Sequence, residues 1–179
     1  MLRLAATVLV AGFALAACNP TSGPGQGFAA CEATDAPAAA QTGGGLSIAP
    51  LEFTCKKLPN GLRVYAMADK NTANVSVTVW YDVGSTDDPA GRSGFAHLFE
   101  HLMFKSTTNL PPEGFDRLTE DAGGFNNAST WNDFTNYYET VPANHLERVL
   151  WGEADRMGSL VIDEANFKSE REVVKEELR

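Results

Sequence analysis

The sequence predicts an α+β fold in which a largely antiparallel sheet is backed by helices. Short extended segments occur next to one another with tight turns between them, which favours antiparallel pairing. The segments also come in the order strands, helices, strands, helices, and this order is typical of α+β domains. A chain of 179 residues with 44% hydrophobic side chains is long enough for one domain with a hydrophobic core.

The first 50 residues are not expected to join that core. Residues 1–17 combine Arg3 with an apolar stretch and small residues, which is typical of an export signal and too short for a membrane-spanning helix. Residues 18–50 are mostly Ala, Gly, Pro, Ser and Thr, so they predict a linker without a packed structure. The folded domain is therefore predicted over residues 51–179.

The end of the signal resembles a bacterial lipobox, formed by Leu15, Ala16, Ala17 and Cys18. In that case cleavage precedes Cys18, and a lipid on Cys18 anchors an exported, periplasmic protein to a membrane. The outer membrane is preferred, because Asn19 stands where an aspartate commonly retains such proteins at the inner membrane. The alternative is a plain secretory signal with an incidental cysteine.

The acidic composition excludes some partners. The formal net charge is −9, so a nucleic acid is not an expected partner, and membrane attachment depends on the lipid rather than on a basic surface. Cys31 and Cys55 either pair in the oxidising export environment or remain free thiols.

The first predicted strands form a hairpin and a third strand. Residues 51–70 contain two extended runs around Asn60 and Gly61, a dipeptide that suits a tight turn. Residues 74–83 alternate apolar and polar side chains, so one face of a strand is buried there.

The later elements alternate between helices and strands. A helix with Ser93 as its N-cap is expected to carry residues 97–101. A helix over residues 112–122 ends at two glycines, residues 125–130 and 136–141 are predicted strands, and two more helices cover residues 143–160 and 163–178.

Residues 97–101 read HLFEH and raise the possibility of a metal site. At about 100° per residue, Phe95, Leu98, Phe99 and Leu102 form a core stripe, whereas His97, Glu100 and His101 gather on the other side. Two imidazoles one turn apart can bind one cation, with the glutamate facing a water on it. The alternative is two histidines that are merely packed or solvated.

A zinc site needs a third protein ligand, and a carboxylate is expected because no cysteine is close in a folded segment. On the last predicted helix, Glu170 and Glu177 share the arc of the apolar residues, whereas Glu172 and Glu176 point to the opposite side. Glu170 and Glu177 therefore require a cation or donors, unless both reach water at the edge of the stripe.

From about residue 58 to residue 179 the sequence resembles the N-terminal catalytic half-domain of the pitrilysin (insulinase) family of zinc peptidases. That family carries the inverted motif H-x-x-E-H, followed by a glutamate 76 residues after the second histidine and another glutamate seven residues before that one. Further matches are the segments VGSTDDPAGRSGFAHLFEHLMFKST, GGFNNAST and EREVVKEEL.

The resemblance implies a role for each matching residue. One Zn²⁺ per chain is expected, and cobalt or manganese would suit the same ligands in vitro. Glu100 would take the proton of the metal-bound water and deliver it to the leaving amine. A peptide substrate would lie as an added strand along residues 124–130, and the alternative for Asn127 is an amide that stabilises a turn. The expected metal ligands are His97, His101 and Glu177, Glu170 would orient a histidine, and the substrate contacts would be Asn127, Ala128 and Ser129.

The expected function is therefore that of a zinc-dependent metalloendopeptidase acting on peptides or unfolded proteins. Members of the family continue beyond the residue equivalent to Arg179 with the rest of this domain and a second domain. The chain is accordingly expected to be a fragment or a truncated product that needs its missing C-terminal half or a partner chain. The alternative function is a non-catalytic, metal-stabilised or peptide-binding subunit, and the intact Glu100 favours the enzyme.

Overall fold

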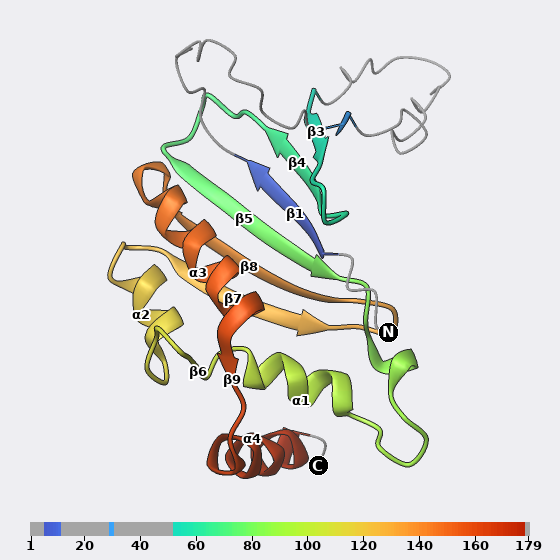
Figure 1. Cartoon of the computed structure of the whole chain (residues 1–179). Coiled ribbons are helices and arrows are strands. Elements are labelled where there is room, and N and C mark those ends of the chain that lie inside the picture. The colour runs from blue at the N-terminus through green and yellow to red at the C-terminus, as the bar shows by residue number, and fades with distance from the viewer. Residues whose placement is uncertain (1–5, 12–28, 31–51, 178–179) are drawn as a thin grey trace, which may run out of the picture.

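The structure is a computed structural model of the whole chain that describes residues 6–11, 29–30 and 52–177 (Figure 1). Its larger sheet has the strand order β2-β3-β4-β1-β5-β8-β7, and β6 and β9 form a small second sheet. The strands are β1 (Ala6–Ala11), β2 (Ala29–Ala30), β3 (Thr54–Lys57), β4 (Arg63–Met67), β5 (Asn74–Tyr81), β6 (Ser106–Thr107), β7 (Phe125–Thr130), β8 (Thr135–Pro142) and β9 (Leu160–Val161). The helices are α1 (Phe95–Leu102), α2 (Gly114–Glu120), α3 (Leu146–Ser159) and α4 (Glu164–Glu177), with short 3₁₀ turns η2 (Ser85–Asp87) and η3 (Ala143–His145).

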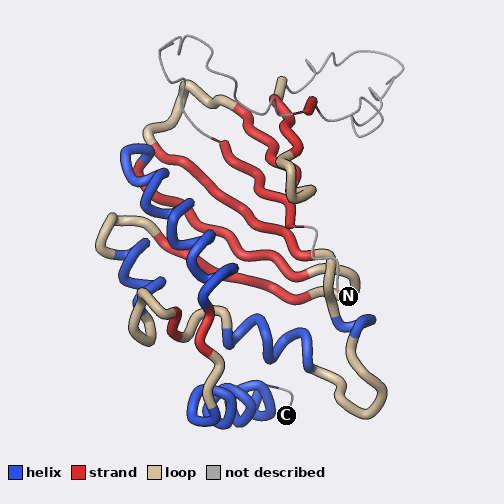
Figure 2. The backbone as a smooth tube through the Cα atoms, in the orientation of Figure 1, coloured by secondary structure: helices blue, strands red, loops and turns tan. Residues whose placement is uncertain are grey.

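The predicted α+β class is confirmed. All described pairs in the larger sheet are antiparallel except that between β1 and β4. The helices gather on one side of the sheet and beyond its β7 edge (Figure 2). The predicted hairpin joins β3 to β4, and Gly61 adopts φ 93°, a value that glycine accepts without strain.

The predicted export signal contributes a strand in the whole chain. β1 lies between β4 and β5, parallel to the former and antiparallel to the latter. It belongs to the apolar stretch of residues 1–17, whose cleavage stays a prediction. Cys18 and most of the predicted linker lie outside the described residues.

Cys55 is disulfide-bonded. The structure therefore rules out the free-thiol alternative for Cys55, whereas Cys31 lies outside the described residues. No helix in the described part of the chain has both the length and the apolar character that crossing a membrane requires.

The main core lies between the sheet and the helices. Along β5 every second side chain is buried, as the alternation predicts, and these side chains pack against β8, α2 and α3. The polar face of β5 points away from the helices. The buried members of this core are Val75, Val77, Val79, Tyr81, Leu118, Tyr137, Val141 and Val149.

The start of α1 differs from the prediction. Ser93 does not cap the helix, because the N-cap is Gly94 in a left-handed conformation with no side-chain bond. Asp88 takes that role from the preceding loop: its two carboxylate oxygens accept the N–H groups of Gly94 at 2.7 Å and Ala96 at 2.8 Å. An acidic group is favourable there, since it satisfies free N–H groups and faces the positive end of the helix dipole.

The buried face of α1 is also rotated from the predicted stripe. Leu98 and Leu102 are buried against Val174 of α4, as expected, but Phe99 is 40% exposed and Glu100 is buried. The rotation follows from the position of α1, which touches β7 on one side and α4 on another. Because α4 packs on α1, residues about 70 positions apart come together.

Candidate metal centre

Helix α1 places two imidazoles side by side. His97 and His101 are four positions apart, so both project from the same side of the helix. Their Nε2 atoms are 3.2 Å apart, and the ring centroids are 4.8 Å apart. Both side chains are partly buried, with 30% and 19% of their surface exposed.

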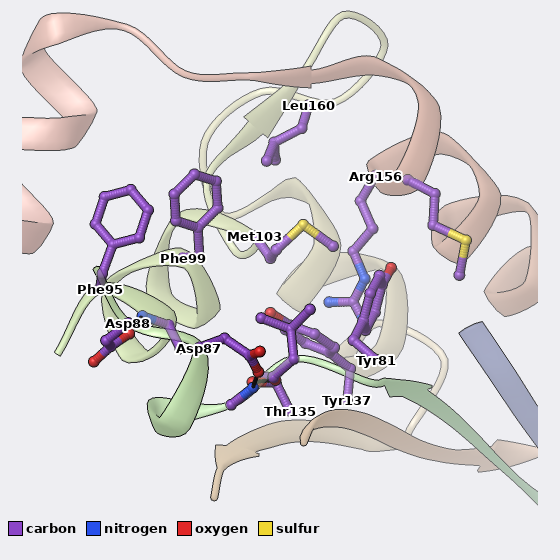
Figure 3. Close-up of a pocket in the computed structure, with 14 residues that line it drawn as sticks. Tyr81, Asp87, Asp88, Phe95, Phe99, Met103, Thr135, Tyr137, Arg156 and Leu160 are labelled. Carbon is purple, nitrogen blue, oxygen red and sulfur yellow. Dashed lines mark hydrogen bonds between the residues drawn. The ribbon is translucent and has the colours of Figure 1, made fainter. Parts of the chain in front are cut away.

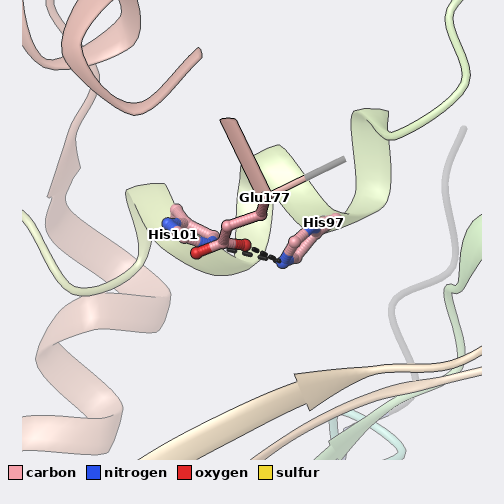
Figure 4. Close-up of side chains that lie close together, drawn as sticks. All are labelled: His97, His101 and Glu177. Atoms are coloured by element: carbon pink, nitrogen blue, oxygen red, sulfur yellow. Dashed lines mark hydrogen bonds and ion pairs between the residues drawn. The ribbon is translucent and has the colours of Figure 1, made fainter. Parts of the chain in front are cut away.

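The end of α4 brings a carboxylate to the same point. Glu177 Oε2 lies 3.4 Å from His97 Nε2 and 3.5 Å from His101 Nε2 (Figure 4). The Glu177 side chain is 48% exposed, so the site opens to solvent on this side. Within residues 6–11, 29–30 and 52–177, these three form the group whose ligand atoms are close enough to share one metal ion.

The spacing of the three atoms fits a tetrahedral ion. With ligand bonds of about 2.1 Å, two ligands of a regular tetrahedron lie about 3.4 Å apart. The three separations of 3.2, 3.4 and 3.5 Å match that value. Nitrogen, nitrogen and carboxylate oxygen, with a position left open, are the donor set of a catalytic zinc site.

Glu100 lies on the same helix but inside the protein. It is 8% exposed, and its Oε2 accepts a hydrogen bond from the hydroxyl of Thr130 at the end of β7. Thr130 was not among the predicted site residues. Little in the sequence indicates it, because Thr130 is simply the last residue of the predicted strand over residues 125–130 and its contact with Glu100 depends on tertiary packing.

Glu170 contacts His101 rather than His97. Its Oε2 lies 3.4 Å from His101 Nδ1, and its Oε1 lies 2.7 Å from the ammonium of Lys105. Burial alone would raise the pKa of the Glu170 carboxyl, but the hydrogen bond and charge of Lys105, together with His101 and Ser169, lower it below its usual range. An ionised Glu170 can accept the Nδ1–H of His101 and so leave Nε2 free as a ligand. Lys105 is a second residue at this site that the sequence did not predict.

The predicted substrate contacts lie on β7, which is an edge strand among the described residues. Asn127 is exposed in this strand rather than in a turn, and its Oδ1 accepts the N–H of Ala128 at 2.8 Å. The Ser129 hydroxyl donates to Asn136 Oδ1 at 2.7 Å. None of the three joins the ligand group of His97, His101 and Glu177, but β7 packs along α1.

A cavity of about 340 Å³ lies beside α1 (Figure 3). Phe95, Phe99 and Met103 line it, whereas His97, His101 and Glu177 do not. The cavity is therefore separate from the candidate metal centre.

Arg156 reaches the cavity from α3 and is buried. Its guanidinium donates to Glu139 and Glu153 and stacks 4.2 Å from the ring of Tyr137. Burial raises the pKa of Glu139 to about 10, with the neighbouring Glu153 acting in the same direction and Arg156 against it. One carboxyl of this pair thus carries a proton at neutral pH, since two buried carboxylates share one guanidinium.

Comparisons with known proteins point to one family. Residues 63–179 match the model of the family described as Insulinase (Peptidase family M16). The chain is 44% identical over 123 residues to Zinc protease PqqE of Helicobacter pylori, covering 68% of this chain and 28% of that protein.

Two solved structures share the fold. A protease from Helicobacter pylori matches with a TM-score of 0.69 and 41% identity, over 71% of this chain and 31% of that one. Pitrilysin matches with a TM-score of 0.65 and 27% identity, over 72% of this chain and 14% of that one. The chain therefore spans less than a third of the length of these relatives.

Proposed function

Because the chain belongs to the insulinase family of peptidases (peptidase family M16), we propose that it forms the zinc-binding part of a metalloendopeptidase that hydrolyses peptides or unfolded proteins. The observation that carries this proposal is the convergence of three ligand atoms within 3.2–3.5 Å of one another. Two imidazole nitrogens and a carboxylate oxygen at this spacing repel one another unless a proton or a cation lies between them. His97, His101 and Glu177 would hold one zinc ion there.

Glu100 is the proposed general base. It sits one residue before His101 on the same helix, and its carboxylate is held inside the protein. A bound zinc ion supplies Lewis acidity, which lowers the pKa of a coordinated water towards about 7 and polarises the scissile carbonyl. Glu100 takes the proton of the attacking water and then gives it to the nitrogen of the leaving amine, so that it returns to its ionised form.

The substrate is proposed to bind along β7. This strand pairs with β8 on one side, and no other described strand pairs with its second side. An extended peptide can therefore add to it through main-chain hydrogen bonds, which makes recognition tolerant of the side chains. Asn127, Ala128 and Ser129 would contact the peptide, next to the helix that carries Glu100.

The complete enzyme is proposed to be exported and lipid-anchored. The lipobox-like residues ending in Cys18 support this location. The relatives are more than three times as long as the part that this chain matches. This difference supports the proposal that further residues, in the same chain or in a partner chain, are needed to enclose the substrate.

Peptide hydrolysis by the longest natural protein that contains this chain tests the function. The wild type, loaded with zinc, should cleave an unstructured reporter peptide and lose this activity with a chelator. Glu100→Gln should keep zinc and lose at least about 100-fold in kcat, since general acid–base catalysis contributes roughly 10² to 10⁴. The exposed Glu120→Gln is the matched control and should cleave like the wild type. Turnover by Glu100→Gln equal to that of the control would refute the proposed chemistry.

A further inference from the structure

The side chain of Glu100 is held by one hydroxyl group. Glu100 leaves α1 towards β7, where the hydroxyl of Thr130 donates to its Oε2. A carboxylate accepts and cannot donate, so the Thr130 proton is directed to Glu100 and the bond fixes which oxygen is occupied. Among the described residues, this is the hydrogen bond that reaches the Glu100 side chain.

Burial makes that bond important. Glu100 is 8% exposed, so water does not solvate its carboxylate as it would on the surface. A buried carboxylate with few donors carries a desolvation cost, and a single charge-assisted hydrogen bond offsets a large part of it. The bond also restricts the terminal torsion of glutamate, which is otherwise broad. With Oε2 occupied, Oε1 is the oxygen that remains available to a water.

The side chain of Thr130 is itself kept in place by a neighbouring residue of the sheet. It faces Thr135 across the β7–β8 pair, and the Thr135 hydroxyl lies 3.3 Å from the Thr130 hydroxyl and donates to the carbonyl of Val83 at 2.9 Å. Thr135 is 5% exposed. Two β-branched side chains with stiff rotamers therefore connect Glu100 to the main chain just after β5.

We infer that Thr130 is a positioning residue, which holds the Glu100 carboxylate so that one oxygen faces the attacking water. This inference rests on the proposed function. Thr130 is also the last residue of β7, the strand on which the peptide would add. The same strand thus aligns the substrate and the base, and the distance between them is set by one element of the fold.

Thr130→Val and Thr130→Ser separate the hydroxyl from the shape of the side chain. Valine keeps the β-branched form and removes the donor, whereas serine keeps the donor. In the longest natural protein containing this chain, Thr130→Val should lower kcat about tenfold or more, with KM within about twofold and zinc content unchanged. Thr130→Ser should restore kcat to within about threefold of wild type. Thr140→Val, which removes a hydroxyl bonded to Ser76 elsewhere in the sheet, is the matched control.

Crystal structures of the wild type and Thr130→Val supply a readout that does not depend on activity. The Glu100 carboxylate should lie within hydrogen-bond distance of Thr130 in the wild type and turn to another rotamer in the variant. Equal kcat in wild type and Thr130→Val, or an unchanged Glu100 rotamer, would overturn the role of Thr130. An inactive wild type would refute the proposed function, and the rotamer comparison would still decide whether Thr130 positions Glu100.

Discussion

The Nε2 atoms of His97 and His101 lie 3.2 Å apart on successive turns of α1. Two neutral imidazoles that direct lone pairs at each other are not stable neighbours unless a proton or a cation lies between them. The third atom, Oε2 of Glu177, comes from an element about 76 positions later and completes a triangle with similar sides. The packing of α4 on α1 therefore determines whether the chain can bind a metal.

The first prediction concerns which of two adjacent glutamates, Glu176 or Glu177, binds the zinc ion. Glu177→Gln should weaken zinc binding severely, because a neutral amide is a poor ligand and one negative charge is lost. Glu176→Gln is the control and should bind zinc like the wild type, since Glu176 is exposed and does not belong to the ligand group. Bound zinc per chain is measured after dialysis against a weak chelator. Loss of zinc from Glu176→Gln but not from Glu177→Gln would show that α4 is rotated.

Glu170 provides a second prediction about the same helix. Glu170→Ala should weaken zinc binding about 10- to 100-fold, because His101 loses the acceptor for its Nδ1–H and Lys105 loses its counter-charge. Zinc affinity is measured by competition with a chelating dye. Glu172→Ala is the matched control, since Glu172 is exposed and pairs with Arg171 and Lys175. Equal zinc affinities of the two variants would exclude a role for Glu170 at the metal centre.

The sequence predicted the fold well where periodicity and turn residues agree. The alternation along β5, the Asn60–Gly61 hairpin and the end of α2 near Gly123 are local features, and all are present. Ser93 was the wrong cap because a more distant side chain, Asp88, reaches the helix terminus. The residues next to the start of the helix do not indicate that Asp88 reaches it from the preceding loop.

The candidate site was likewise predictable where it depends on the local spacing of residues along a helix. The spacing within HLFEH places His97 and His101 together on any helix, and the helical arc selects Glu170 and Glu177 over their neighbours. Lys105 and Thr130 were not predicted, because their contacts depend on how α1 packs against α4 and β7. Tertiary packing also buried Glu100, which the helical wheel had placed on the polar side.

The buried carboxyl pair on β8 and α3 predicts how stability changes with pH. The pKa of Glu139 is about 10 in the folded chain against an ordinary value of 4.5. Between these values folding takes up a proton, so the free energy of unfolding falls as the pH rises. The glutamine side chain of Glu139→Gln stays neutral at every pH. The free energy of unfolding of this variant, measured by urea titration, should therefore fall less between pH 6 and pH 9 than that of the wild type.

The exposed Glu147→Gln on α3 is the control for that measurement and should follow the wild-type pH dependence. A Glu139→Gln protein that loses stability as steeply as the wild type over this range would show that Glu139 is already ionised in the folded state.

A further prediction concerns Cys18 and the attachment of the protein to a membrane. In a Gram-negative host the protein should incorporate a labelled fatty acid and fractionate with membranes, because the lipid supplies the apolar anchor. Cys18→Ala should abolish the label, whereas Cys31→Ala should retain it. Wild-type protein without label would favour a plain secretory signal over the lipobox.

Anomalous diffraction at the zinc edge, from crystals of the zinc-loaded protein, tests the central claim most directly. The account predicts one peak per chain, about 2.0–2.2 Å from Nε2 of His97, Nε2 of His101 and a carboxylate oxygen of Glu177. A peak bound by other residues, or no peak at this position at full zinc loading, would contradict the assignment of these three residues as the metal centre.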